Sequence, residues 1–285
     1  MMKMSRYLID VSEHNGSINL MQAKESISGI IARSSWGWGS DQIDKEWCNN
    51  AKQANQYGLP LYAYHYCYAR NEEEALSEAK LAISACKGYQ VNVIYYDMEY
   101  SDFQTNLSAN QYYNIAKTFC DYIERNGYAA GIYANEDWFR HKLINVGFSK
   151  WTLWIANYGA NDGNNHWNGQ VKFNPFGNVL IHQFTSNAKA GVLKGIKGIP
   201  STGLDGSLDH GLLDTFNGNK ITISDIFNMK DSVKIKKSSK WYDGQIIPDF
   251  VYNRNYTIME IIKDSVVIGI DGKVTGAINI NNLYK

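Results

Sequence analysis

Two carboxylates, Asp97 and Glu99, lie two residues apart where an apolar, strand-like run of the sequence ends. Side chains at positions i and i+2 of a strand share a face, so both acids should project together beyond that strand. Repulsion between them, with partial burial, raises one pKa and leaves the other group ionised. Hydrolysis of a glycosidic bond needs such a proton donor beside an anion. A D-x-E pattern also occurs at solvated strand ends, so it needs support from the rest of the chain.

The sequence around this pair predicts alternating strands and helices. Apolar runs between turn residues indicate eight strands, at residues 7–11, 29–33, 61–66, 91–96, 129–133, 152–156, 179–184 and 207–209. Helical spacing indicates five helices, at residues 19–28, 44–57, 72–86, 109–126 and 136–143. This alternation predicts parallel strands joined by right-handed crossovers, and eight strands indicate a closed α/β barrel of the TIM type. Later gaps are rich in Gly and Asn, so we expect few helices on the last third.

The active sites of such barrels lie at the carboxyl ends of the strands. Six polar residues fall at or near predicted strand ends: Asp10, Asp97, Glu99, Tyr133, Gln183 and Asp209. One acid at a strand end is often a helix cap or a loop hydrogen-bonder. Four carboxylates that converge from distant segments instead indicate a functional site.

Aromatic residues are abundant, with 20 tyrosines and 8 tryptophans, and several fall near the same predicted rim. These are Tyr64, Tyr66, Tyr96, Tyr100, Tyr133, Trp154 and Tyr158. Flat rings can stack on the apolar faces of sugars, although a single Tyr or Trp near a strand more often packs in the core. As a group they favour carbohydrate binding. The candidate substrate-binding residues are Tyr64, Tyr133, Trp154, Tyr158 and Gln183.

Composition excludes several classes of protein. The net charge is zero, with 28 basic and 28 acidic residues, so nothing indicates a nucleic-acid partner. No run approaches the roughly 18 apolar residues of a membrane helix. The N-terminal residues lack the apolar region of a signal peptide, so we expect synthesis in the cytoplasm without export by the usual secretory route.

Neither a metal nor a cofactor is expected. Four cysteines fall in different predicted elements without C-x-x-C spacing, which indicates reduced core thiols: Cys48, Cys67, Cys86 and Cys120. The six histidines form no close cluster of zinc ligands, and His65 is expected to be a buried, hydrogen-bonded residue.

Several segments in order resemble glycoside hydrolase family 25, the CH-type lysozymes that cut bacterial peptidoglycan. The matching segments are Ile9-Asp10-Val11-Ser12, Tyr64-His65-Tyr66, Tyr96-Asp97-Met98-Glu99, Leu153-Trp154-Ile155-Ala156-Asn157-Tyr158 and His182-Gln183-Phe184-Thr185-Ser186. They resemble the family's opening block, its Y-H-F segment, its D-x-E signature and its L-W-x-A-x-Y and W-Q-Y-T-S blocks. The resemblance as a whole covers about residues 7 to 214.

The resemblance implies roles for the acids. Glu99 matches the proposed general acid, and Asp97, Asp10 and Asp209 match the other acids of the groove. The family's last strand carries a V-D-x-N pattern, of which this sequence keeps Asp209 but has Gly211 in place of the Asn. Asp205 is the competing alignment, although the glycine after it is typical of a turn.

The implied reaction is hydrolysis, with retained configuration, of the β-1,4 bond from N-acetylmuramic acid to N-acetylglucosamine. Either Asp97 orients the substrate's own acetamido group for attack while Glu99 protonates the leaving oxygen, or a carboxylate or a water attacks directly. A chitinase-like hydrolase and a catalytically silent glycan-binding protein are the alternatives. The former would show a longer D-x-x-D-x-D-x-E run, and intact Asp97 and Glu99 disfavour the latter.

Beyond the barrel, residues 1–214, the sequence predicts a linker at 215–232 and a small domain at 233–285. Short apolar runs alternate there with turns, and Asp271-Gly272 fits a hairpin. This pattern resembles the SH3-like cell-wall-binding modules of bacteriophage lysins; a module that only caps or dimerises the enzyme is the alternative. The whole chain thus resembles a phage endolysin that acts on the wall after release from the host, and an autolysin exported by another path remains compatible.

Overall fold

The structure is a computed structural model that describes residues 6–100, 107–166, 173–213, 229–237, 239–262, 265–279 and 282–284. These residues form two compact units. Residues 215–228 of the expected linker lie outside the described residues. No helix in the described part of the chain is long and apolar enough to cross a membrane.

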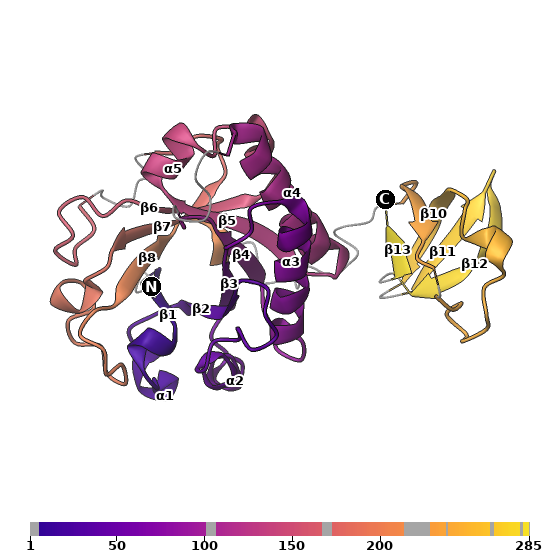
Figure 1. Cartoon of the computed structure of the whole chain (residues 1–285). Helices are drawn as coiled ribbons and strands as arrows, with labels where there is room; N and C mark the ends of the chain where they lie inside the picture. Colours follow the sequence, from indigo (N-terminus) through magenta and orange to yellow (C-terminus); the bar gives the residue numbers. More distant parts are fainter. Residues whose placement is uncertain are drawn as a thin grey trace. The chain divides into compact units, whose positions relative to one another are not determined.

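In the first unit, eight described strands close into a barrel in sequence order (Figure 1). They are β1 (Tyr7–Val11), β2 (Gly29–Trp36), β3 (Leu61–Tyr66), β4 (Val93–Asp97), β5 (Ala129–Asn135), β6 (Thr152–Ala156), β7 (Val179–Thr185) and β8 (Asp205–Asp209). Strands β1 to β7 pair in parallel. This confirms the predicted TIM-like α/β barrel.

An α-helix follows each of the first five strands (Figure 1). The helices are α1 (Leu20–Ala23), α2 (Trp47–Tyr57), α3 (Glu72–Cys86), α4 (Ala109–Arg125) and α5 (Glu136–His141). The described connections after β6 and β7 hold only the short 3-10 helix η3 (Ala188–Ala190), as the Gly- and Asn-rich sequence predicts. Helix α1 is shorter than predicted, and β2 runs three residues further, to Trp36.

Strand β8 corrects the expectation of an all-parallel barrel, because it runs antiparallel to both β7 and β1. A parallel return needs a crossover that carries the chain back to the opposite end of the barrel. The segment between Thr185 and Asp205 contains no α-helix to do so. The chain therefore enters β8 at the rim where β7 ends. The strand also begins at Asp205, two residues earlier than predicted.

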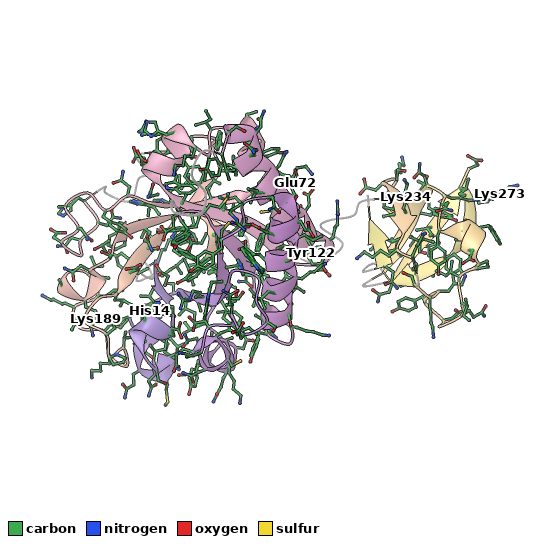
Figure 2. The ribbon with its side chains drawn as sticks, viewed as in Figure 1. His14, Glu72, Tyr122, Lys189, Lys234 and Lys273 are labelled. Carbon is green, nitrogen blue, oxygen red and sulfur yellow. The ribbon has the colours of Figure 1, made fainter. Side chains whose placement is uncertain are left out.

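Alternation along the strands assigns each residue to one face of the barrel wall. Leu8, Ile31, Tyr62, Tyr95 and Ile181 belong to the cluster inside the barrel. Residues next to them in sequence pack with the helices in a larger outer core (Figure 2). Inward-facing residues two positions nearer the carboxyl ends of the strands therefore line the mouth of the barrel.

A close contact inside the barrel needs a glycine. A Cβ on Gly131 of β5 would lie 2.4 Å from the ring of Tyr95, so this position admits no side chain while that ring fills the centre. The Tyr95 ring packs edge-on against Trp154, with ring centroids 5.6 Å apart. Tyr95 belongs to the buried layer beneath the mouth, and Trp154 reaches from this layer into the lining of the mouth.

The second unit is a five-stranded antiparallel sheet in the order β12-β11-β10-β9-β13. Its strands are β9 (Ser232–Ile235), β10 (Tyr256–Ile262), β11 (Ser265–Ile270), β12 (Lys273–Asn279) and β13 (Leu283–Tyr284). Ten buried residues, among them Val233, Tyr256 and Ile268, give it a core of its own. Asp271 and Gly272 both have positive φ and turn the chain from β11 into β12, as predicted.

Candidate active site

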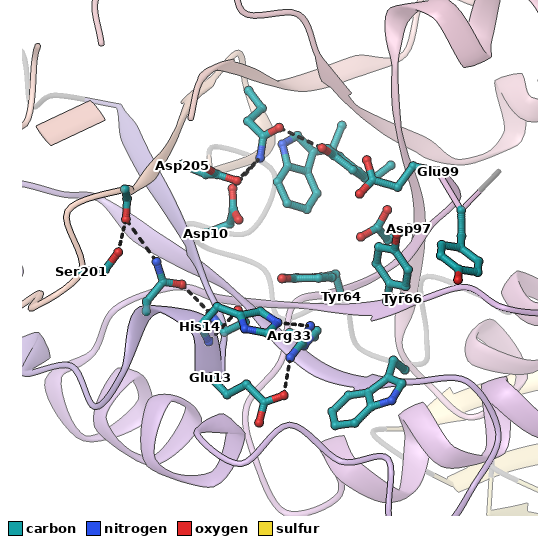
Figure 3. Close-up of a pocket in the computed structure, with 18 of the residues that line it drawn as sticks. Asp10, Glu13, His14, Arg33, Tyr64, Tyr66, Asp97, Glu99, Ser201 and Asp205 are labelled. Atoms are coloured by element: carbon teal, nitrogen blue, oxygen red, sulfur yellow. Dashed lines mark hydrogen bonds and ion pairs between the residues drawn. The ribbon is translucent and has the colours of Figure 1, made fainter. Parts of the chain in front are cut away.

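A cavity of about 660 Å³ opens at the carboxyl ends of the parallel strands and the start of β8 (Figure 3). Five carboxylates line it: Asp10, Asp97, Glu99 and Asp205, which come from three segments far apart in the sequence, and Glu13, which forms an ion pair with Arg33. Aromatic side chains form much of its remaining wall: Trp36, Tyr64, Tyr66, Tyr68, Tyr100, Tyr133 and Trp154. The cavity thus combines groups that transfer protons with rings that can stack on sugars.

Strand alternation explains why these acids meet. Asp10 lies two residues after the inward Leu8, and Asp97 two residues after the inward Tyr95, so both point into the mouth. Glu99 follows Asp97 by two residues and lines the same cavity. Asp205 is the direct partner of Asp10 across the β1–β8 pair.

Asp209, expected on this rim, is at the opposite end of the barrel. Because β8 runs antiparallel, Asp209 pairs with Ile181 at the start of β7, and its buried carboxylate forms an ion pair with Arg6. It also accepts backbone hydrogen bonds from Gly211 at 3.2 Å and Leu213 at 3.0 Å. Its expected place in the groove is therefore wrong, and the competing alignment, Asp205, lies in the cavity.

Gln183 connects both sides of the cavity. Its Nε2 donates to Asp10 Oδ2 at 2.6 Å and to Asp205 Oδ2 at 3.3 Å. Its Oε1 accepts from the hydroxyls of Tyr133 and Tyr158, each at 2.9 Å. Since a primary amide offers two donors and two acceptor positions, these four bonds use all of them. Gln183 was expected to contact substrate, but the structure gives it the geometry of a group that holds the acids.

Burial is the largest cause of the raised pKa of Asp10, Asp97, Glu99 and Asp205. It raises the pKa of Asp97 well above its ordinary value, and the negative charges of Glu99 and Asp10 raise it further. Burial and then the charge of Asp205 raise the pKa of Asp10 in the same way. Burial and then Asp205 raise the pKa of Glu99 to about 7. The cavity therefore holds protons at neutral pH.

Asp205 is intermediate among these acids. Burial raises its pKa to about 6, while a hydrogen bond with Asp10 acts in the opposite direction. Because Asp10 and Asp205 are paired across neighbouring strands, a proton bound to one lowers the charge that the other faces. The pair can hold one proton between its two carboxyl groups.

Asp97 has an unused acceptor. Its Oδ1 atom is buried and has no hydrogen-bond partner among the described residues. A buried polar atom without a partner is costly, and such atoms often serve a ligand. A hydrogen-bond donor of a bound substrate would satisfy it.

The sequence did not single out the charged wall opposite these acids. Arg33 donates from Nε to Asp44 and from a terminal nitrogen to Glu13, both at 2.8 Å, and lies 4.9 Å from the ring centre of Trp36. Arg33, Glu13 and Trp36 all line the cavity. A lone cation at the end of an apolar strand was the available signal, but its two anionic partners come from segments 11 and 20 residues away.

Three further candidate residues, Tyr64, Trp154 and Tyr158, line cavities at the mouth of the barrel. Tyr64 and Trp154 line the main cavity and pack edge to face, with ring centroids 6.0 Å apart. Trp154 also donates to Ser207 Oγ at 3.1 Å. Tyr158 lines a second cavity, which shares Glu99 and Tyr133 with the first. His65 is buried, with Nδ1 2.8 Å from Ser35 Oγ.

The family model described as glycosyl hydrolases family 25 matches residues 9–192. Among similar solved structures is the modular autolysin LytC from Streptococcus pneumoniae in complex with a synthetic peptidoglycan ligand, at 25% identity and a TM-score of 0.59. The match covers 73% of this chain and 47% of that one, so this chain spans about half the length of the autolysin. No curated protein matches the sequence.

Two further structures share the fold. The catalytic domain of endolysin ply40 from bacteriophage P40 of Listeria monocytogenes has 21% identity and a TM-score of 0.58, over 77% of this chain and 100% of that one. The spore cortex lytic enzyme SleM from Clostridium perfringens has 16% identity and a TM-score of 0.59, over 98% of this chain and 85% of that one.

Proposed function

Because the chain belongs to glycosyl hydrolases family 25, we propose that it is a lysozyme that cleaves the β-1,4 bond from N-acetylmuramic acid to N-acetylglucosamine. The observation that carries the proposal is the group of four carboxylates in one aromatic-walled cavity. The similarity to an autolysin solved with a peptidoglycan ligand supports the substrate class.

Glu99 is the proposed general acid. A pKa of about 7 keeps a large share of this carboxyl protonated at neutral pH, where an ordinary glutamate has lost its proton. Glu99 donates that proton to the glycosidic oxygen as the bond to the anomeric carbon breaks. The bonding electrons leave with the oxygen, and positive charge develops on the sugar ring.

Asp97 acts on the developing charge. In one route, its unpaired Oδ1 accepts the N–H of the substrate's acetamido group, whose carbonyl oxygen then attacks the anomeric carbon. In the other route a carboxylate attacks instead and forms a glycosyl-enzyme. In both routes a water molecule then attacks the anomeric carbon and gives a proton to Glu99, which restores the general acid. Trapping a glycosyl-enzyme with a fluorinated substrate distinguishes them.

Asp10 and Asp205 supply the remaining negative charge of the cavity. Gln183 donates to both, which fixes their orientation relative to the mouth of the barrel. A partly ionised pair of this kind stabilises positive charge on the ring in the transition state. Gln183, Tyr133 and Tyr158 thus act by positioning these acids.

The test is mass spectrometry of fragments released from purified Gram-positive peptidoglycan, with borohydride reduction to mark new reducing ends. Wild type should give muramitol ends, and Glu99→Gln should give none while still binding walls. Reduced glucosamine ends would instead identify a glucosaminidase. Normal activity of Glu99→Gln would overturn the assignment of the acid.

We further propose that the protein is an endolysin whose C-terminal sheet is an SH3-like module that binds the cell wall. The fold shared with a phage endolysin's catalytic domain supports the first part. The small antiparallel sheet with its own core supports the second. Clearing of Gram-positive cell suspensions by the added protein tests the lytic role.

A further inference from the structure

A second cavity of about 650 Å³ adjoins the main one. It lies between the carboxyl ends of β5 and β6 and the start of α5, and it shares Glu99 and Tyr133 with the main cavity. Its other lining residues are Asn135, Glu136, Asp137, Arg140, Ala156, Asn157 and Tyr158. A group bound here would lie beside the proposed general acid.

Charges of both signs line this second cavity. Arg140 donates from Nε to Glu136 at 2.7 Å, and a terminal nitrogen of Arg140 lies 2.6 Å from the same carboxylate. The other terminal nitrogen has no partner in the described part of the chain, and the side chain is 52% exposed. The guanidinium lies 4.2 Å from the ring centre of Phe173, which fixes its plane. Arg140 is therefore held in place with donors left for an anion.

The acidic residues of this cavity differ in availability. Glu136 is 22% exposed and also accepts a hydrogen bond from Asn157, so its charge is already satisfied. Asp137 is 75% exposed and pairs with the exposed His141 at 3.0 Å. Asp137 thus presents a carboxylate that a cation of a ligand can reach. The cavity offers one anion-binding group and one cation-binding group within a single helical turn.

Uncharged sugar rings offer nothing to pair with these groups. In peptidoglycan, charges are concentrated in the peptide stems, which carry carboxylates and the amine of a diamino acid. Resting on the proposed function, we propose that the second cavity binds the peptide stem of the muramic acid residue at the scissile bond. Arg140 binds a stem carboxylate and Asp137 a stem ammonium group. Aromatic rings hold the glycan in the main cavity, and this charged cavity makes turnover depend on the stem.

The test compares two soluble substrates. One is glycan strands that carry uncross-linked stems, and the other is the same strands after an amidase has removed the stems and the lactyl carboxylates that it exposes have been converted to amides. The enzymes are wild type, Arg140→Gln and Asp137→Asn. Arg70→Gln is the matched control, because Arg70 forms an i,i+4 ion pair with Glu74 at 2.8 Å outside both cavities.

On stem-bearing strands, Arg140→Gln should lower kcat/KM about tenfold, as expected for loss of one charge-assisted hydrogen bond. Asp137→Asn should lower it in the same direction, and Arg70→Gln should not. On stem-free strands all three variants should match wild type. An equal loss on both substrates, or no loss on either, would overturn the proposal. If wild type forms no new reducing ends from either substrate, the proposed function itself fails.

Discussion

Glu99 and Asp97 are two residues apart, yet their surroundings prepare them for different tasks. Glu99 is only partly buried, and its pKa of about 7 lies close to neutral pH. Asp97 is buried deeper, with one oxygen that no described residue satisfies. An acid near its pKa can give and retake a proton, whereas a buried group with an unused acceptor is suited to hold a substrate donor.

The rate should therefore depend on the protonation of Glu99. Since the proposed acid is active only when protonated, kcat/KM should be high below pH 7 and fall as pH rises through about 7. The decline should approach tenfold per pH unit well above that value. Measurement on a soluble peptidoglycan fragment from pH 5 to 9 checks this. A profile that stays flat to pH 9 would contradict the role of Glu99.

Burial of Glu99 should also cost stability at neutral pH. The raised pKa means that folding disfavours the ionised form, so stability is intact below about pH 4.5 and declines as pH rises toward 7. Glu99→Gln removes this charge and should raise the free energy of unfolding at pH 8 by up to about 3 kcal/mol. At pH 4.5 the gain should nearly vanish. Urea unfolding of both proteins at the two pH values measures this, and an equal gain at both would contradict it.

At the scale of elements, the direction of β8 decides which acid reaches the cavity. The strand carries an aspartate at each end, Asp205 and Asp209, and both are on its inward face. Antiparallel pairing with β1 brings Asp205 to Asp10, and leaves Asp209 beside Arg6. Asp205 can therefore take part in the proposed reaction, while Asp209 holds the start of β1 in place.

Substitutions at the two ends should separate these roles. Asp205→Asn should lower kcat at least about tenfold without lowering the free energy of unfolding, because it removes a buried charge near the reacting sugar. Asp209→Asn should instead weaken the buried ion pair with Arg6 and lower the free energy of unfolding by about 2 kcal/mol or more, with kcat retained in the folded fraction. Activity assays beside urea unfolding distinguish them. The reverse pattern would mean that Asp209 serves the reaction.

At the scale of the molecule, the chain has two units, each with a core of its own. A barrel with a separate core should fold without the small sheet. Linking a binding module to a catalytic domain raises its effective concentration on an insoluble substrate. Under the proposed function, the barrel carries out hydrolysis and the small sheet attaches the protein to the wall.

Deletion of residues 231–285 should therefore weaken binding to whole walls by at least about tenfold. Because the proposed catalytic groups all lie in the barrel, kcat/KM on a soluble fragment should stay unchanged. Pull-down with intact walls and turnover of the fragment provide the two readouts. If the truncated protein binds walls as well as the full chain, the C-terminal sheet is not the wall-binding module.

The sequence alone determined the barrel and much of its mouth. Alternating apolar runs and helical segments predicted the barrel, and a period of two placed Asp10 and Asp97 on its inner face. It also predicted the turn at Asp271-Gly272, since those residues tolerate positive φ. These features depend on residues close together in the chain, so local steric preferences and the pattern of burial suffice to predict them.

Only the tertiary structure decided the direction of β8 and the role of Gln183. A period-two pattern reads the same in both directions, so it cannot tell whether Asp205 or Asp209 faces the groove. That choice follows from the return after β7, which contains no α-helix, and from closure against β1. The bond from Gln183 to Asp10 joins residues 173 positions apart. Barrel closure brings the two together, and no local pattern encodes that contact.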